Sequence, residues 1–188
     1  MSGILVERHK TLITFDSPER SYIRPLRNEA QAFLKTTGVD FGRLRLFSKH
    51  TTMGLILQEI DEHKLLEDFI WLAQYIVPTD VRGSVYLDGL VDPTEFPLSK
   101  KWRHNCEDNP LLPSGERDHD MNGDRHARAL LFTQSEVGMD IEQGILQTGR
   151  FKGPAAVEFD GGEETSNRAK RRRTIAMTID EYSRGPKI

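Results

Sequence analysis

A long irregular stretch, residues 79–123, divides the periodic parts of this chain into two blocks. It is rich in Pro, Gly, Asp and Asn, and loops of this length inside compact domains are usually functional or disordered. A chain of 188 residues is long enough to bury a core and favours one domain. We therefore predict a single domain over residues 1–180, with residues 79–123 as an inserted loop and residues 181–188 as a frayed tail.

Each block carries strand and helix patterns. Apolar residues that alternate with polar ones indicate strands, and apolar residues at helical spacing indicate helices. In the first block we predict a strand at 4–15, a helix at 28–35, two strands within 42–59 and a helix at 62–76. In the second we predict a helix at 124–133 and strands at 137–146, 155–159 and 174–179. The order β-α-β-β-α-(long loop)-α-β-β-β predicts an α+β fold with a mixed or antiparallel sheet.

Composition argues against several classes of function. The net charge of -3 gives no overall attraction for nucleic acid or for an anionic membrane. The one cysteine, Cys106, has no partner for an internal disulfide, and the first residues lack a signal-peptide pattern. No window approaches the roughly 18 apolar residues of a membrane span. We expect a soluble, cytoplasmic protein that does not bind membranes, with nucleic acid an unlikely partner.

Three of the six histidines lie in unusual sequence contexts: His50, His104 and His126. Imidazole titrates near neutrality and can act as an acid, a base or a metal ligand. The spacing of the three matches no local ligand pattern, so surface or core histidines and a shared site both stay open. We interpret His9, His63 and His119 as ordinary surface or core histidines.

The chain also contains a basic run, residues 170–173, just before the last predicted strand. An arginine guanidinium matches phosphate oxygens, but the run could equally be a solvated start of a strand or a guard against edge pairing. If the strand includes the run, alternation sends Arg171 and Arg173 to one face and Arg172 to the other. Most carboxylates near these segments are expected to face water.

Taken in order, these fragments resemble the YjbQ family, also called the secondary thiamine-phosphate synthase family. The resemblance covers residues 4–179. The matching residues are His50-Thr51-Thr52-Met53, Gln58-Glu59, Asp68, Arg103-His104, Asn122 with His126 and Leu130, Gly144, Gly149, Glu158 and the arginines 171–173. The chain departs from the family at Arg150-Phe151-Lys152, where the family has Thr-Trp-Gln, at Met53, and in its enlarged loop.

The resemblance implies a homotrimer with a pocket lined by His50, His104 and His126. It also implies a transfer of a hydroxymethylpyrimidine group from its diphosphate to a thiazole phosphate, with a small phosphorylated metabolite as the partner. The three histidines would hold a divalent metal (Zn or Mg) or act as acid and base, with Glu59 or Asp68 orienting an imidazole. The expected substrate-binding residues are Arg103, Asn122, Lys152, Arg171 and Arg173. We further expect Lys152, Arg171 and Arg173 to form one phosphate-binding wall facing the histidines. The alternative is a metal- or phosphometabolite-binding protein without turnover.

Overall fold

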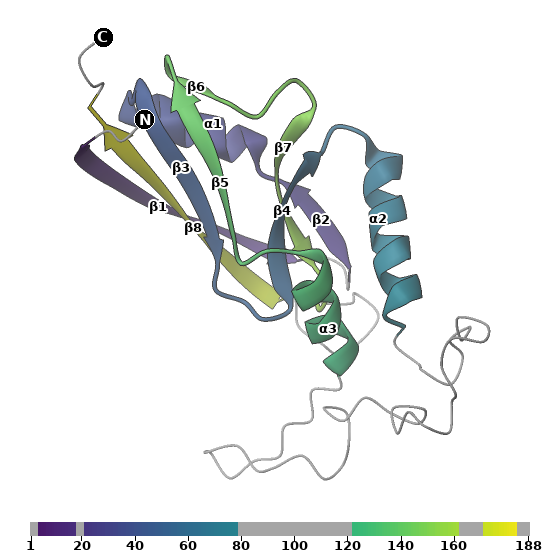
Figure 1. Cartoon of the computed structure of the whole chain (residues 1–188). Coiled ribbons are helices and arrows are strands. Elements are labelled where there is room, and N and C mark those ends of the chain that lie inside the picture. The colour runs from purple at the N-terminus through teal and green to yellow at the C-terminus, as the bar shows by residue number, and fades with distance from the viewer. Residues whose placement is uncertain (1–3, 18–20, 79–121, 162–170, 184–188) are drawn as a thin grey trace, which may run out of the picture.

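The computed structural model describes residues 4–17, 21–78, 122–161 and 171–183 (Figure 1). The described residues form eight strands and three helices. In order they are β1 (Leu5–Ser17), β2 (Tyr22–Pro25), α1 (Arg27–Thr37), β3 (Phe41–Ser48), β4 (Met53–Glu59), α2 (His63–Ile76), α3 (Gly123–Phe132), β5 (Glu136–Glu142), β6 (Ile145–Leu146), β7 (Lys152–Glu158) and β8 (Arg171–Tyr182).

The strands form two sheets, and all the strand pairs in the described chain are antiparallel. The larger sheet has the order β1-β8-β3-β5-β6, and the smaller one has the order β2-β7-β4. The first and last strands of the chain are therefore neighbours, although almost the whole sequence lies between them. The predicted α+β class is confirmed.

The core-facing side of the larger sheet follows from strict alternation. In β1, Ile13 and Phe15 are buried, whereas Leu12 and Thr14, on the other face, are exposed. Directly opposite Ile13 lies Ile175 of β8, which is fully buried. Helix α1 covers this face with Ala30 and Leu34, and it ends at Gly38, whose left-handed backbone (φ 68°) suits a residue without a Cβ.

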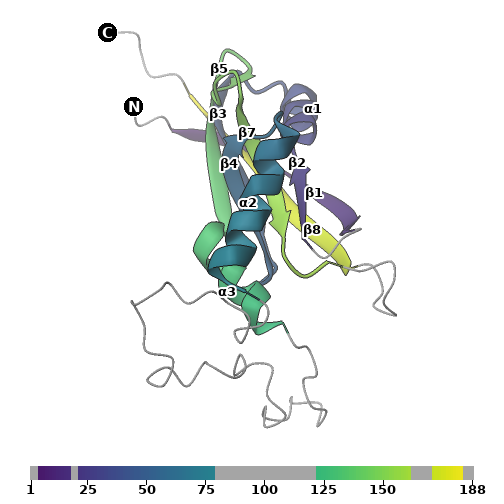
Figure 2. The ribbon, with the colours of Figure 1, turned by 90° about the vertical axis from the view of Figure 1, so that its right-hand side faces the viewer.

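The smaller sheet is buried on both faces, which explains the continuous apolar runs in β4 and β7. On one face, Leu55 and Ala156 join the core shared with the larger sheet and α1. On the other face, Ile56 and Val157 join a second core with residues of α2 and α3. Figure 2 shows α2 lying along this outer side of the small sheet. The small sheet thus lies between the two hydrophobic cores.

The structure differs from the sequence-based elements in four places. Strand β2 was not predicted, because four residues are too short for a periodic pattern. The predicted strand at 137–146 is a hairpin of β5 and β6, turned by Gln143 and Gly144, which both have positive φ. Helix α3 begins at Gly123, and β8 continues to Tyr182, into the tail that was expected to fray. In the described residues, no helix is both long and apolar enough to cross a membrane.

Candidate functional site

Four segments that are distant in sequence meet where β7 ends and β8 begins. Strand β4 pairs with β7 so that Met53 lies opposite Glu158. The corner between β3 and β4, residues 49–52, therefore sits beside the end of β7, and the Phe159 amide donates to the Thr52 carbonyl at 3.1 Å. The buried Ser48 closes this corner: its hydroxyl donates to the Met53 carbonyl (2.8 Å) and lies 3.3 Å from the His50 amide, whose hydrogen bond it accepts.

A buried ion pair between Glu158 and Arg173 forms the centre of the site. The Arg173 Nε donates to one carboxylate oxygen of Glu158, and Nη2 donates to the other at 2.9 Å. The same Nη2 contacts the Thr52 hydroxyl at 3.1 Å. Burial raises the pKa of Glu158, and the hydrogen bond and charge of Arg173 offset only part of this effect. The hydrogen bonds to Glu158 of β7 and to Thr52 of the β3–β4 corner hold Arg173 in one orientation.

His50 lies against this pair and is half-buried. Its Nε2 accepts a hydrogen bond from the Thr174 amide at 3.0 Å, so the proton of the neutral ring belongs on Nδ1. Nδ1 lies 3.4 Å from Arg173 Nη1, which can only donate. Burial, and next the positive charge of Arg173, lower the pKa of His50. The ring is therefore neutral near neutral pH. The N–H groups of His50 Nδ1 and Arg173 Nη1 then lie side by side, and both are hydrogen-bond donors.

Asp160 joins the start of helix α3 to the start of β8. Its carboxylate is fully buried and accepts hydrogen bonds from Asn122 Nδ2 at 2.7 Å and from Arg125 Nη1. Arg171 Nη2 lies 3.0 Å from the same carboxylate, and the Arg171 side chain stays 30% exposed. Among the described residues, Arg125 and Arg171 thus contact the carboxylate of Asp160, and Arg173 contacts that of Glu158.

Four of the predicted site residues are brought together here: His50, Asn122, Arg171 and Arg173. As alternation predicted, Arg171 and Arg173 point the same way. Their partners in the structure are the carboxylates of Asp160 and Glu158.

Other predicted residues lie elsewhere. Lys152 is paired with Glu59 at the opposite end of β7 from Glu158, about 20 Å away along an extended strand. The expected wall of Lys152 with Arg171 and Arg173 is therefore wrong, because the register separates them. Glu59 is half-buried at that same far end, and Asp68 is exposed on α2.

The convergence of the three histidines stays a prediction. His126 is half-buried in α3, and its amide donates to the Asn122 carbonyl at 3.2 Å, which places its backbone one helical turn from the site. Arg103 and His104 lie outside the described residues. For the expected metal, His50 is a poor ligand as it stands, because an N–H donor lies beside each of its ring nitrogens.

Asp160 and Arg125 were not predicted as site residues, and Thr52 and Glu158 were recognised only as part of the family pattern. Asp160 had a recognisable signal: it follows the apolar run of β7 directly and precedes Gly161-Gly162. A carboxylate at the end of a buried strand needs a cationic partner, and the basic run at 170–173 follows it in the sequence. Arg125 gave no signal, since most helical arginines face solvent.

Matches to known proteins cover nearly the whole chain. Residues 11–181 match the family described as UPF0047 protein YjbQ-like. A UPF0047 protein of Methanothermobacter thermautotrophicus is 22% identical over 159 residues, which cover 85% of this chain and 88% of that protein.

Solved structures share the fold. A YbjQ-like protein of unknown function from Sulfolobus solfataricus superposes with a TM-score of 0.68 at 18% identity, covering 93% of this chain and 98% of the other. A YjbQ/UPF0047 family protein from Clostridium acetobutylicum gives a TM-score of 0.63 at 18% identity, covering 90% and 98%. Since the family match extends over most of the sequence and these structures have the same architecture, the chain belongs to the YjbQ family.

Proposed function

We propose that this protein binds a small phosphorylated metabolite beside His50 and Arg171, and that it has secondary thiamine-phosphate synthase activity. The observation that carries the proposal is the pair of N–H donors, His50 Nδ1 and Arg173 Nη1, held 3.4 Å apart with no acceptor of their own between them. An anionic oxygen placed beside both would accept two hydrogen bonds. The guanidinium groups of Arg173 and Arg171 bring positive charge to this place, which favours such an anion.

The proposed reaction needs charge stabilisation more than proton transfer. A C–N bond forms between the methylene carbon of the hydroxymethylpyrimidine and the thiazole nitrogen, while the C–O bond to diphosphate breaks. The diphosphate leaves with the electron pair, and the thiazole nitrogen carries no proton to remove. Catalysis of such a step rests on preorganised cations around the leaving group.

The exposure of each side chain determines which part it would take in stabilising this charge. Arg171 is the arginine of the network that can reach outward, since its side chain is 30% exposed. Arg173 is buried against Glu158, so it would hold His50 and the ligand in position. No step of the proposed reaction runs through a metal, because His50 would first have to give up a contact to bind one. A Zn or Mg ion held by His50, His104 and His126 stays an expectation of the family.

The alternative is binding of a phosphorylated metabolite without turnover. It is favoured by one observation: the carboxylates of Glu158 and Asp160 neutralise most of the arginine charge that a departing diphosphate would need. In that case the protein would bind diphosphate-containing ligands and release no diphosphate.

The test is to incubate the purified protein, with and without Mg²⁺, with hydroxymethylpyrimidine diphosphate and thiazole phosphate. Thiamine phosphate and free diphosphate are then measured in equal amounts if the transfer occurs. We expect turnover to fall by at least about tenfold in Arg171→Ala and His50→Gln, and to be unchanged in Lys152→Ala, which lies at the far end of β7. Binding without product formation would support the alternative, and neither binding nor product would refute both.

Assembly as a homotrimer is also part of the proposal. It is supported by apolar side chains exposed on the edge strand β1, among them Leu5 and Leu12, since exposed apolar patches often mark contacts between subunits. Light scattering coupled to size-exclusion chromatography would test it, and a monomer at micromolar concentration would contradict it. A cytoplasmic location stays a prediction.

A further inference from the structure

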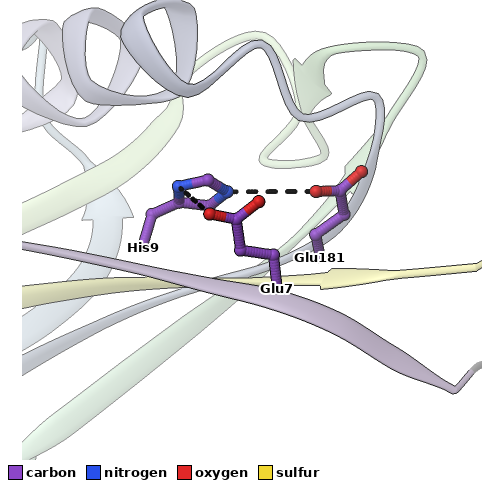
Figure 3. A group of neighbouring side chains, drawn as sticks. All are labelled: Glu7, His9 and Glu181. Atoms are coloured by element: carbon purple, nitrogen blue, oxygen red, sulfur yellow. Dashed lines mark ion pairs between the residues drawn. The ribbon is translucent and has the colours of Figure 1, made fainter.

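A histidine and two glutamates gather on the core-facing side of the β1–β8 pair, at the opposite end of β8 from Arg173. Glu7 and His9 are two residues apart on β1, so their side chains share one face. Glu181 of β8 lies directly opposite Glu7 in the strand register. Figure 3 shows the two ring nitrogens of His9 joined by dashed lines to the carboxylates of Glu7 and Glu181. These residues are therefore held together by two long paired strands.

The separations suit a small ion. One carboxylate oxygen of Glu181 lies 3.9 Å from His9 Nε2, and one of Glu7 lies 3.8 Å from His9 Nδ1. One ligand atom from each of the three residues can be chosen so that all lie within 4.8 Å of one another. Two ligand atoms of a tetrahedral zinc are about 3.4 Å apart, since each is about 2.1 Å from the metal. Small side-chain rotations would bring the three ligand atoms to the separations that a zinc ion requires.

Within the described residues, no arginine or lysine pairs with these two glutamates. Glu7 and Glu181 form a directly opposed pair of like charges, which is unfavourable between antiparallel strands. Neighbouring arginines do not relieve it: Arg8 and Arg45 both bind Asp180, whose side chain points to the other face. His9 Nε2 is buried and has no hydrogen-bond partner, although a buried imidazole nitrogen normally has one.

An irregularity in the backbone pairing of β1 also favours a binding site at this position. The register between β1 and β8 shifts between Leu5 and Glu7, and such irregularities re-aim side chains next to functional sites. Glu7 has a side chain that is 64% exposed, whereas His9 is 21% exposed, so the cluster is closed on the core side and open to water on the other. Three protein ligands with one open position are typical of zinc sites that bind a water or a substrate.

We propose that Glu7, His9 and Glu181 form a binding site for a divalent transition metal of the zinc class. Imidazole with two carboxylates suits zinc, whereas magnesium and calcium prefer oxygen ligands alone. The site is separate from the His50 site and does not rest on the proposed enzymatic function. It gives His9 a role that its sequence context did not indicate.

The test is calorimetric titration of the chelator-treated full-length protein with zinc chloride, with thermal unfolding measured in parallel. Wild type should bind one equivalent of zinc at this site and unfold at a higher temperature with zinc, because the metal joins β1 to β8. His9→Gln and Glu181→Gln should lose that equivalent or bind it at least about a hundredfold more weakly, since even loss of an outer-shell partner costs about 10- to 100-fold. Glu7→Gln changes the most exposed of the three side chains, so it provides a variant that should fold normally.

The matched control is His63→Gln. His63 lies 3.1 Å from Glu67 on the exposed surface of α2, and it offers a histidine and a carboxylate without a third ligand. This variant, and His50→Gln at the other site, should keep the equivalent of zinc that His9→Gln loses. The proposal is overturned if wild type binds no zinc, or if all three cluster variants keep its stoichiometry and affinity. Equal losses in His63→Gln and His9→Gln would show adventitious surface binding and would also overturn it.

Discussion

Arg173 of β8 donates two hydrogen bonds to the buried carboxylate of Glu158 at the end of β7, and this pair links the two sheets of the protein. The two residues belong to different sheets, so the contact fixes how the β3–β4 corner, β7 and β8 meet. The position of His50 depends on this junction, because its two ring nitrogens lie beside Arg173 and the next residue, Thr174.

Removing the arginine of this pair should destabilise the fold. Arg173→Ala leaves Glu158 buried without its cation, and breaking a buried pair in this way costs about 3–5 kcal/mol. Urea denaturation would measure the free energy of unfolding. Arg43→Ala is the matched control, because Arg43 pairs with Asp140 on the exposed surface and such pairs contribute about 0–1 kcal/mol. A loss below about 1 kcal/mol in Arg173→Ala would contradict the buried, paired geometry.

The lowered pKa of His50 predicts a specific dependence of stability on pH. The unfolded chain titrates this residue near about 6.5, whereas the folded state protonates it only at lower pH. The His50 contribution is therefore complete above about pH 6.5, and it is lost as the pH falls through the folded pKa, because the unfolded state takes up the proton first. His50→Asn should flatten the fall in unfolding free energy between about pH 7 and 5. His63→Asn, at an exposed helix position, should leave the wild-type slope, and an unchanged slope in both variants would refute this assignment.

Ligand binding should distinguish the two ends of β7. Arg171→Ala should weaken the binding of inorganic diphosphate by about 10- to 100-fold, since one charge-assisted contact contributes about 1.5–3 kcal/mol. Lys152→Ala removes an equal charge at the opposite end of β7 and should leave the affinity unchanged. Calorimetric titration of both variants measures this, and a larger effect of Lys152→Ala would move the anion site to that end of the strand.

Strand β4 approaches the segment after α3 too closely for any side chain at Gly54. A Cβ there would overlap the Thr133 side chain and lie 3.2 Å from the Gln134 carbonyl. Gly54→Ala should therefore lower the free energy of unfolding by about 1–3 kcal/mol through overpacking. Gly138→Ala is the control, because its Cβ would meet only the flexible end of Arg43, and it should stay within about 0.5 kcal/mol of wild type. Equal stability of the two variants would contradict the close approach.

Much of the fold could be predicted because the local patterns are strong. The alternating residues of β1 and β8 and the helical spacing in α2 each lie within one element, so they can be read without knowing its neighbours. The short strands β2 and β6 could not be predicted, because their four and two residues are too few to show a periodic pattern. The site was predicted in part, since the His50 corner and the arginines of β8 stand out by residue type alone.

The sequence by itself determined the order of strands and helices, the α+β class, and the common face of Arg171 and Arg173. Only the tertiary structure decided which charges meet. The antiparallel register placed Lys152 at the far end of β7 from Glu158, and it placed Glu181 beside Glu7 although almost the whole chain separates them. That register is set by the burial of apolar side chains such as Ile175 and Leu55 in the core. Pairing between distant segments depends on this shared core, so no local pattern of charged residues can reveal it.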